Sequence, residues 1–471
     1  MLSLRDIVLI GVIAVLVPFI LKRPWIGILA WSWIGFMNPH RLAWGIMHSA
    51  PVAMVIGLLT ILAYGLSREP KRLPITFLSG LMIVYCIWMS ITTIFALVPD
   101  DAFTKWDKAI KVMIGVFLTL ALMYTRERIT LLICVIVGSI GFYSVKGGIF
   151  TVLSGGNNMV FGPAGSFFAS NNALALATIM VIPLMRYLHL QLENQWIRLG
   201  MIGAIGLSII SVVGSYSRGA FLALSAMLFV LIIKSPRRGI LLCAAFFGAV
   251  IALAIVPDKW YDRMHSITTY EEDGSAQGRF EAWRYAYEVA KERPFTGGGF
   301  LLGGDLQRFL RLVPGSNSSR AAHSIYFEVL GEHGFIGLAI FLLIGATALL
   351  TGTWVISRTK NRPDLTWASH LAAMLQVSMV GYAVGGAFLS QALFDLYWVM
   401  VVIMIQLKIL VQKELAFERA ALKESFSSPQ RRQPHRIQPA TARTPSRPEP
   451  AAPTIIGKKL GGIRSKLEEQ S

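Results

Sequence analysis

Long runs of apolar residues recur along this chain from one end to the other. Runs of about 15 to 25 residues can cross a hydrocarbon core of about 30 Å as helices. Backbone groups in lipid must be satisfied within helices, and the runs lack the period-two alternation of a β-barrel. The sequence therefore predicts an all-α polytopic membrane protein with twelve or thirteen transmembrane helices. The runs are 7–21, 25–37 (short), 50–66, 75–98, 109–124, 129–153, 172–188, 197–216, 219–233, 239–256, 335–356, 371–394 and 397–412.

The composition agrees with this class. Hydrophobic residues make up 54% of the chain and charged residues only 15%, whereas soluble globular proteins have about 25% charged residues. The formal charge of +18 could suggest a nucleic-acid partner, but 12 Lys/Arg against 6 Asp/Glu in residues 413–471 place +6 of it in the tail alone. We therefore expect a lipid bilayer and no nucleic acid as partner.

Basic residues in short connections predict the orientation. They occur at 22–23, 67–72, 125–128, 234–238 and 357–362, and the positive-inside rule assigns these connections to the cytoplasm. The connections that contain NPHRLAWG, PDDAFTKWDK, SGGNNMVFGPAGSFFASNN and SYSRG then lie on the opposite side. This threading puts the N-terminus outside, but an interfacial hairpin at 7–37 would put it inside with fewer full spans.

Four regions follow from these patterns. Residues 1–256 hold the N-terminal transmembrane helices, 257–334 form one large periplasmic loop, and 335–412 hold the C-terminal transmembrane helices. Residues 413–471 form a basic, Pro-rich cytoplasmic tail that is too poor in apolar residues to fold.

An amphipathic helix is expected within the large loop, over 279–292. Phe280, Trp283 and Tyr287 fall at i, i+3 and i+7 and form one aromatic stripe. We expect this stripe to pack against the membrane domain, with a platform for an acyl chain or a sugar as the alternative.

A cationic side chain within or at the edge of a membrane bundle costs free energy of insertion, so its presence suggests a function. Arg218 lies in a tight turn between two apolar runs, where it either snorkels to the interface or binds an anion. Lys146, inside an apolar run, has the same two interpretations. Arg279 opens the loop helix, where the helix dipole disfavours a cation, so an anionic ligand or a neighbouring carboxylate would have to stabilise it.

Two histidines, His323 and His333, precede the run 335–356. On an unbroken helix they would face different directions, and either could be structural or act as a general base. No HxxxH, HExxH or paired carboxylates at metal spacing occur, so we expect no metal and no cofactor. GGGF at 297–300 lacks the strand and the Lys-Ser/Thr of a nucleotide loop, so it does not predict a nucleotide site. ATP is absent outside the cytoplasmic membrane, so a synthetic reaction there would need a donor that carries its own activation.

Four short motifs occur together in this order: SYSRGA, GRFEAW, PFTGGGF and AAHSIYFEVLGEHGFIGL. Together they resemble the O-antigen ligase and polymerase superfamily. RPWIGILAWSWIGFMNPHRLAWG and KGGIFTVLSGGNNMVFGPAGSFFASNNALALA resemble the O-glycosylation ligases associated with exosortase systems in Gram-negative bacteria. The resemblance covers about residues 1–410.

The resemblance implies a GT-C-like membrane glycosyltransferase of the bacterial inner membrane. Such an enzyme moves a glycan from a polyprenyl (undecaprenyl) diphosphate carrier to an acceptor protein, lipid or saccharide on the periplasmic face. By motif, Arg218 and Arg279 would hold the diphosphate and His323 would activate the acceptor. The family often has Asn after this histidine, where this chain has Ser324.

The residues themselves are compatible with this chemistry. A departing lipid diphosphate gains negative charge, and arginine's planar fork suits phosphate oxygens without a metal. Lys146, Asn171 and Asn172 could complete the pocket. A repeat-unit polymerase of the same superfamily remains an alternative, and a transporter or flippase of lipid-linked glycan is a third hypothesis.

Overall fold

The structure is a computed structural model, and it describes residues 3–235, 237–255, 257–258, 260–261, 274–301, 305–316 and 318–427. These residues form helices joined by turns and short connections, without a β-strand among them. The α-helices up to the large loop are α1 (Leu4–Lys22), α2 (Pro24–Met37), α3 (Val52–Leu66), α4 (Phe77–Ile94), α5 (Pro99–Leu122), α6 (Arg126–Leu153), α7 (Asn171–Gln191), α8 (Gln195–Val213), α9 (Arg218–Lys234) and α10 (Arg238–Ile255). The later ones are α12 (Gly274–Glu292), α13 (Leu306–Leu312), α14 (Ile325–Thr359), α15 (Thr366–Gly386) and α16 (Asp395–Ser427), and single 3₁₀ turns are η1 (Pro39–Leu42), η2 (Ile46–His48) and η4 (Pro363–Leu365).

The all-α prediction is confirmed, and every apolar run falls mainly within a helix. Within the part of the chain that the structure describes, six helices are long and apolar enough to cross a membrane: α1, α4, α6, α7, α8 and α14. The others are shorter, as α2 and α3 are, or carry more polar side chains. The chain is thus a multi-pass membrane protein, while twelve or thirteen spans remains a prediction.

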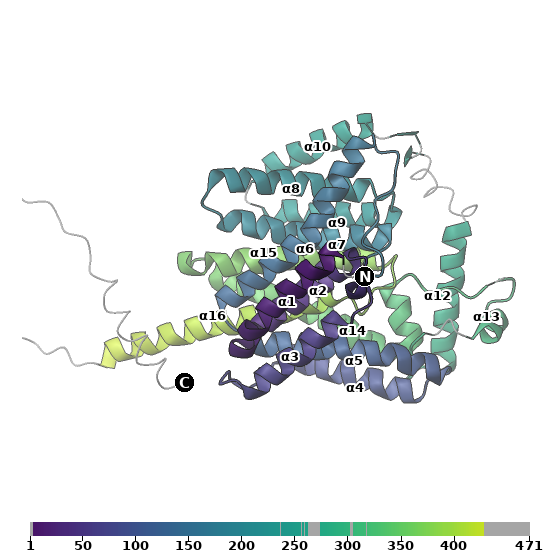
Figure 1. Ribbon diagram of the computed structural model, residues 1–471, viewed down its shortest axis with the longest axis horizontal. Coiled ribbons are helices and arrows are strands. Elements are labelled where there is room, and N and C mark those ends of the chain that lie inside the picture. The colour runs from purple at the N-terminus through teal and green to yellow at the C-terminus, as the bar shows by residue number, and fades with distance from the viewer. Residues whose placement is uncertain are drawn as a thin grey trace, which may run out of the picture. The chain divides into compact units, whose positions relative to one another are not determined.

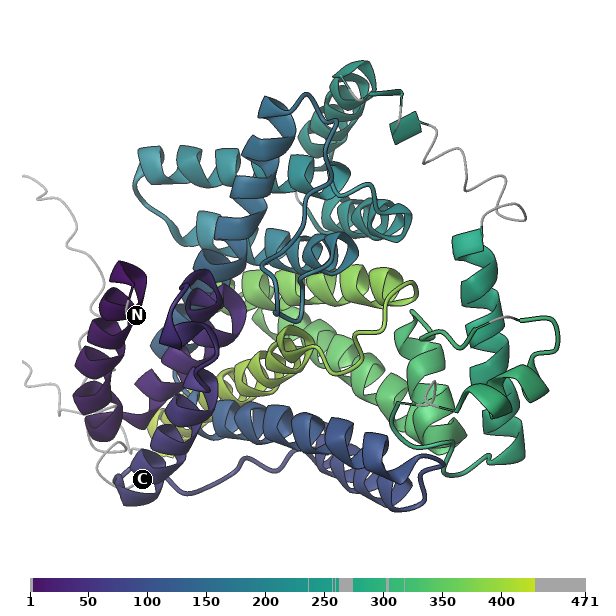
Figure 2. The same cartoon turned by 45° about the vertical axis from the view of Figure 1, so that its right-hand side comes forward.

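Helix α7 is largely buried in the compact unit Met1–Glu418, where it packs against α6, α8, α9 and α15 (Figures 1 and 2). Small and hydroxyl residues let α15 approach it closely. Ser378 Oγ donates to the Met180 carbonyl at 2.7 Å, and a Cβ at Gly381 would come within 2.7 Å of Ile179. Without a hydrophobic driving force between helices in lipid, such close contacts hold membrane bundles together.

Helix α14 is broken at Gly334, which has φ 70° and ψ −173°. A Cβ there would lie 2.4 Å from the Phe295 carbonyl oxygen, so this crossing requires glycine. The break frees carbonyls of the preceding turn, and the glycine-rich segment satisfies two of them: Gly298 N donates to Gly331 O and Gly299 N to Glu332 O. The break coincides with the predicted start of the membrane run at residue 335.

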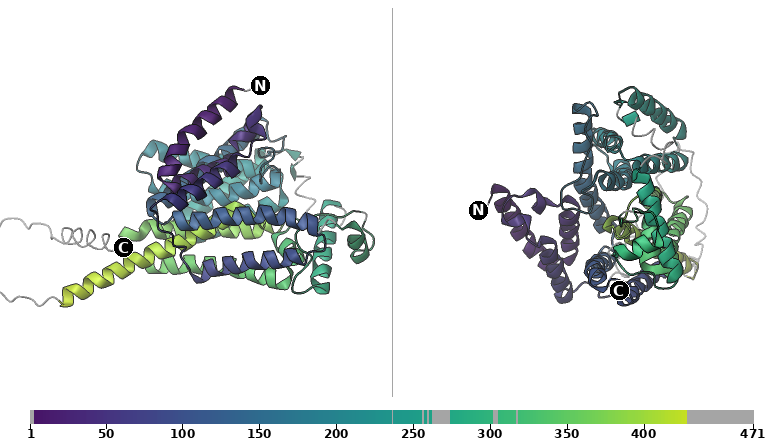
Figure 3. Two further views of the ribbon diagram at one scale, coloured as in Figure 1. Left: turned by 60° about the horizontal axis from the view of Figure 1, so that its bottom comes forward. Right: turned by 90° about the vertical axis from the view of Figure 1, so that its right-hand side faces the viewer.

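Within the large loop, α12 lies across the ends of the long helices and contacts α14 (Figures 1 and 3). The short helix α13 packs on it through Tyr285 and Phe309, whose ring centroids are 4.6 Å apart. The loop is therefore an ordered element in its described residues. Helix α16 continues past the expected run to Ser427, so the first part of the predicted tail is helical. Residues 428–471, where disorder was predicted, lie outside the described residues.

The connections predicted to share a side also meet in space. At one end, Leu97 N donates to Gly298 O at 2.8 Å, and Gln391 Nε2 donates to Phe167 O at 2.9 Å. At the other end, Arg128 from one basic connection pairs with Glu69 from another at 2.7 Å. Which end faces the cytoplasm stays a prediction.

Candidate active site

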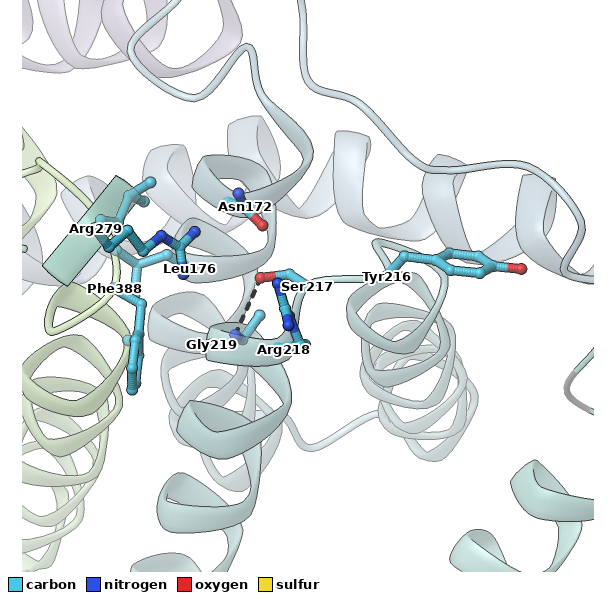
Figure 4. A pocket seen from close by; sticks show the side chains of 11 residues that line it. Asn172, Leu176, Tyr216, Ser217, Arg218, Gly219, Arg279 and Phe388 are labelled. Atoms are coloured by element: carbon cyan, nitrogen blue, oxygen red, sulfur yellow. Dashed lines mark hydrogen bonds between the residues drawn. The ribbon is translucent and has the colours of Figure 1, made fainter. Parts of the chain in front are cut away.

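A pocket that opens to the solvent lies where α7 and α9 begin (Figure 4). Two helix N-termini meet there with two arginine side chains, one from α9 and one from α12. Unsatisfied backbone N–H groups and the helix dipole favour an anion at such a place. The lining residues are Asn172, Leu176, Tyr216, Ser217, Arg218, Gly219, Ala220, Arg279, Gly385, Phe388 and Leu389.

A tight turn after α8 places Arg218 at the first position of α9. Tyr216 has the left-handed φ of 55°, and Ser217 caps α9 because its Oγ accepts from Ala220 N at 3.1 Å. Asn171 Nδ2 donates to the Ser215 carbonyl at 2.8 Å and ties this turn to α7. Arg218 is half-buried at the pocket wall.

Arg279 reaches the same pocket from α12 (Figure 4). The buried residues of α12 include Tyr285 and Val289. The expected packing of the aromatic stripe is wrong in part, because Phe280 and Tyr287 are 44% and 45% exposed. The apolar face that α12 buries is the one with Ala and Val, offset from the aromatic stripe.

Trp283, the remaining ring of the stripe, holds the segment that carries His323. Its Nε1 donates to the Ala322 carbonyl at 2.7 Å, and its ring stacks on Phe327 with centroids 5.0 Å apart and planes at 7°. Residue 323 itself has a left-handed φ of 44°, which costs a non-glycine residue about 1 kcal/mol or more. Trp283 and the start of α14 on either side fix this unusual backbone position.

His323 is exposed, yet its surroundings lower its pKa. Partial desolvation by neighbouring protein lowers its pKa below the usual 6.5, the positive charge of Arg279 lowers it further, and Glu328 opposes this. A lowered pKa keeps the imidazole neutral at physiological pH, as a general base requires. His323 does not line the pocket, but it lies close enough to Arg279 for their charges to interact.

His333 has a different environment. Its side chain is 1% exposed, and Nδ1 lies 2.7 Å from Thr92 Oγ1 on α4. Its ring packs edge-on against Phe300, with centroids 4.6 Å apart. These contacts are those of a hydrogen-bonded core residue that joins α14 to α4.

The other predicted pocket residues separate into two groups. Asn172 lines the pocket, and Asn171 acts behind it through the Ser215 carbonyl. Lys146 is exposed on α6 and does not contribute to the lining. Ser324, at the position where the family often has Asn, is buried and is the N-cap residue of α14.

Sequence reasoning missed a buried ion cluster next to the site. Lys105 Nζ lies 2.9 Å from Glu328 Oε1 and 2.7 Å from Glu332 Oε1. Glu332 also accepts from Leu301 N, and Glu328 accepts from Ala392 N. The cluster joins α5, α14 and two connections, and the i, i+4 spacing of the two carboxylates was the one available signal.

Within the described residues, no group of three or more His, Cys, Asp or Glu side chains is placed to hold a metal ion. The converging cations are arginines instead. The pocket thus offers fixed positive charge together with helix N-termini, and a neutral imidazole lies beside it.

Comparison with known families divides the chain into two matched parts. Residues 4–192 match a family of unknown function (DUF5935), and residues 203–342 match the family described as O-Antigen ligase. No curated protein matches the chain. The second match covers Arg218, Arg279 and His323, so the pocket's cations and the neighbouring imidazole lie in the part of the chain that is similar to this family. Residues 203–342 are thus similar to the O-Antigen ligase family, and this similarity supports a function like that of the membrane glycan ligases and polymerases of that superfamily.

Proposed function

We propose that this protein is a GT-C-like glycosyltransferase that moves a glycan from a polyprenyl diphosphate carrier to an acceptor hydroxyl on the periplasmic face of the inner membrane. One observation carries the proposal. Arg218 and Arg279, 61 positions apart, enter one pocket at the beginnings of α7 and α9. A diphosphate at this site would be stabilised by two guanidinium groups and by two helix N-termini.

The proposed transfer step forms a bond from the acceptor oxygen to the anomeric carbon and breaks the bond from that carbon to the diphosphate oxygen. The leaving group departs with the bonding electron pair, and Arg218 and Arg279 stabilise its developing charge. His323 Nδ1 or Nε2 takes the acceptor proton, which its lowered pKa allows at neutral pH. Side chains already in place supply this stabilisation, so the step requires no metal.

Replacement of the three proposed residues by Ala in cells tests this assignment. Arg279→Ala and Arg218→Ala should abolish glycan attachment, as should His323→Ala, each at normal protein level. Arg284→Ala is the matched control for Arg279, because Arg284 lies on the same helix, is exposed and does not line the pocket. Normal glycan attachment by well-expressed His323→Ala protein would end the base assignment.

Lys146→Ala serves as a second control. The sequence suggested Lys146 for the pocket, but Lys146 is exposed on α6 and is not among the residues that line the pocket. We expect normal transfer from this variant. Loss of transfer with normal protein level would require a wider site that reaches α6.

A ligase and a polymerase differ in what accumulates when the gene is deleted. A ligase leaves full-length chains on the lipid carrier, whereas a polymerase leaves single repeats. We favour the ligase, which the exosortase-associated resemblance of the N-terminal third supports. A transporter would tolerate trimming of the large loop, whereas a transferase needs the loop because it carries Arg279 and His323.

A further inference from the structure

A second concentration of positive charge lies at the other end of α7. The pocket contains Asn172 from the first turn of this helix, while Arg186 and His189 lie near its C-terminus. At 1.5 Å per residue the two places are about 20 Å apart along the helix. The second place therefore cannot belong to the candidate active site.

The pair Arg186 and His189 is built into the bundle. Arg186 NH1 donates to His189 Nδ1 at 2.6 Å, which fixes the imidazole as the acceptor at this nitrogen. The His189 side chain is 5% exposed and Arg186 is half-buried. A guanidinium held by a neutral imidazole keeps its positive charge uncompensated.

Further cations converge on this pair from neighbouring elements. Arg186 interacts electrostatically with Arg198 at the start of α8, with Arg237 before α10 and with His370 near the start of α15. Glu193, the nearest carboxylate along the chain, is exposed, and no described carboxylate is among the charges that act on Arg186 or His370. Four elements thus bring basic groups together without a described carboxylate to balance them.

The side chains around Arg198 are apolar and exposed. Trp196, Ile197 and Leu199 are 73%, 55% and 60% exposed, and only 17% of the most apolar window of α8 is buried in the structure. Tryptophan at the end of an apolar helix is typical of the membrane interface, where head groups meet acyl chains. An anion bound here by Arg186 and Arg198 would have a lipid-facing helix directly beside it.

We propose that Arg186, His189, Arg198, Arg237 and His370 form a binding site for the phosphate head group of an anionic phospholipid, whose acyl chains lie along the exposed face of α8. Basic pockets between transmembrane helices on the cytoplasmic side bind such head groups. The basic connection at 234–238 is on the side that the positive-inside rule assigns to the cytoplasm. The apolar surface beside the cations favours a lipid over a soluble phosphate.

Lipid titration of the purified full-length protein tests this site. Phosphatidylglycerol or phosphatidylcholine is added in neutral detergent, and bound lipid is counted by native mass spectrometry. Wild type should prefer phosphatidylglycerol. Arg186→Gln and Arg237→Gln should each weaken its binding about fivefold, which corresponds to the roughly 1 kcal/mol that one basic residue contributes near an anionic surface.

Arg358→Gln is the matched control, because Arg358 is exposed near the end of α14, carries the same charge and should leave binding unchanged. Arg237 is exposed, so its variant stays informative if Arg186→Gln fails to fold. Equal binding by Arg237→Gln and Arg358→Gln would overturn the proposal. Inorganic phosphate that displaces the lipid at equal concentration would also overturn it, in favour of a soluble anion.

Discussion

Replacement of Lys105 by Met should destabilise the protein strongly, because it leaves two carboxylates buried together. Lys105 lies 2.9 Å from Glu328 and 2.7 Å from Glu332, and the three side chains are only 19%, 12% and 8% exposed. Breaking a buried ion pair by removing one partner costs about 3 to 5 kcal/mol. We expect the low end, about 3 kcal/mol, because partial exposure lets water relieve some of the repulsion.

The same helix offers a matched control. Lys111 pairs with Asp107 on α5, but these side chains are 61% and 55% exposed. Such a surface pair contributes about 0.3 to 0.5 kcal/mol, so Lys111→Met should lower the free energy of unfolding by no more than that. Both variants remove one positive charge from α5, and they differ in burial and in the number of carboxylates left behind.

The assay is an unfolding titration of purified full-length protein in one detergent. A loss of about 3 kcal/mol reduces the folded-to-unfolded ratio about 150-fold, and Lys111→Met should stay close to wild type. Adding Glu332→Gln to Lys105→Met should recover part of the loss, since it removes one of the two negative charges. If Lys105→Met were as stable as Lys111→Met, the cluster would not hold α5 to α14 as argued.

Three further outcomes follow from the site. The pKa of His323 lies below 6.5, and the neutral form of the imidazole accepts the proton. Transfer should therefore fail only as the pH falls through that lowered pKa. A pH profile of purified enzyme with its acid limb at or above 6.5 would contradict this. Trp283→Phe should keep the ring stack on Phe327 but lose the hydrogen bond to the Ala322 carbonyl, the residue before His323. This change should lower kcat more than it raises KM for the donor. A kcat equal to that of wild type would show that Trp283 has no positioning role. Gly219→Ala would place a Cβ 2.7 Å from the Cβ of Phe388 at the pocket, and should lower the free energy of unfolding by about 1 to 3 kcal/mol in an unfolding titration. Gly203 on α8 has open space around it, so Gly203→Ala should leave the free energy of unfolding unchanged. Equal stability of the two variants would refute the close contact.

The local features of the fold were readable from the sequence because their causes are local. Apolar runs predicted the helices, and the break of α14 at Gly334 lies directly before the predicted start of the run at residue 335. The turn before Arg218 follows from the Ser217 cap and the short spacing between two runs. Helical periodicity could also find the stripe of Phe280 and its neighbours, but not the direction in which it would face.

Packing between distant elements decided the rest. Lys105 contacts Glu328 only because α5 lies beside α14, and the spacing of residues within either helix does not predict this contact. In the same way the convergence of Arg218 with Arg279 depends on how α12 lies across the bundle. The sequence alone determined which residues carry charge in an apolar chain, because composition and periodicity are properties of short segments. Tertiary structure decided which of those charges share a site, since burial and distance arise only when helices far apart in the chain pack together.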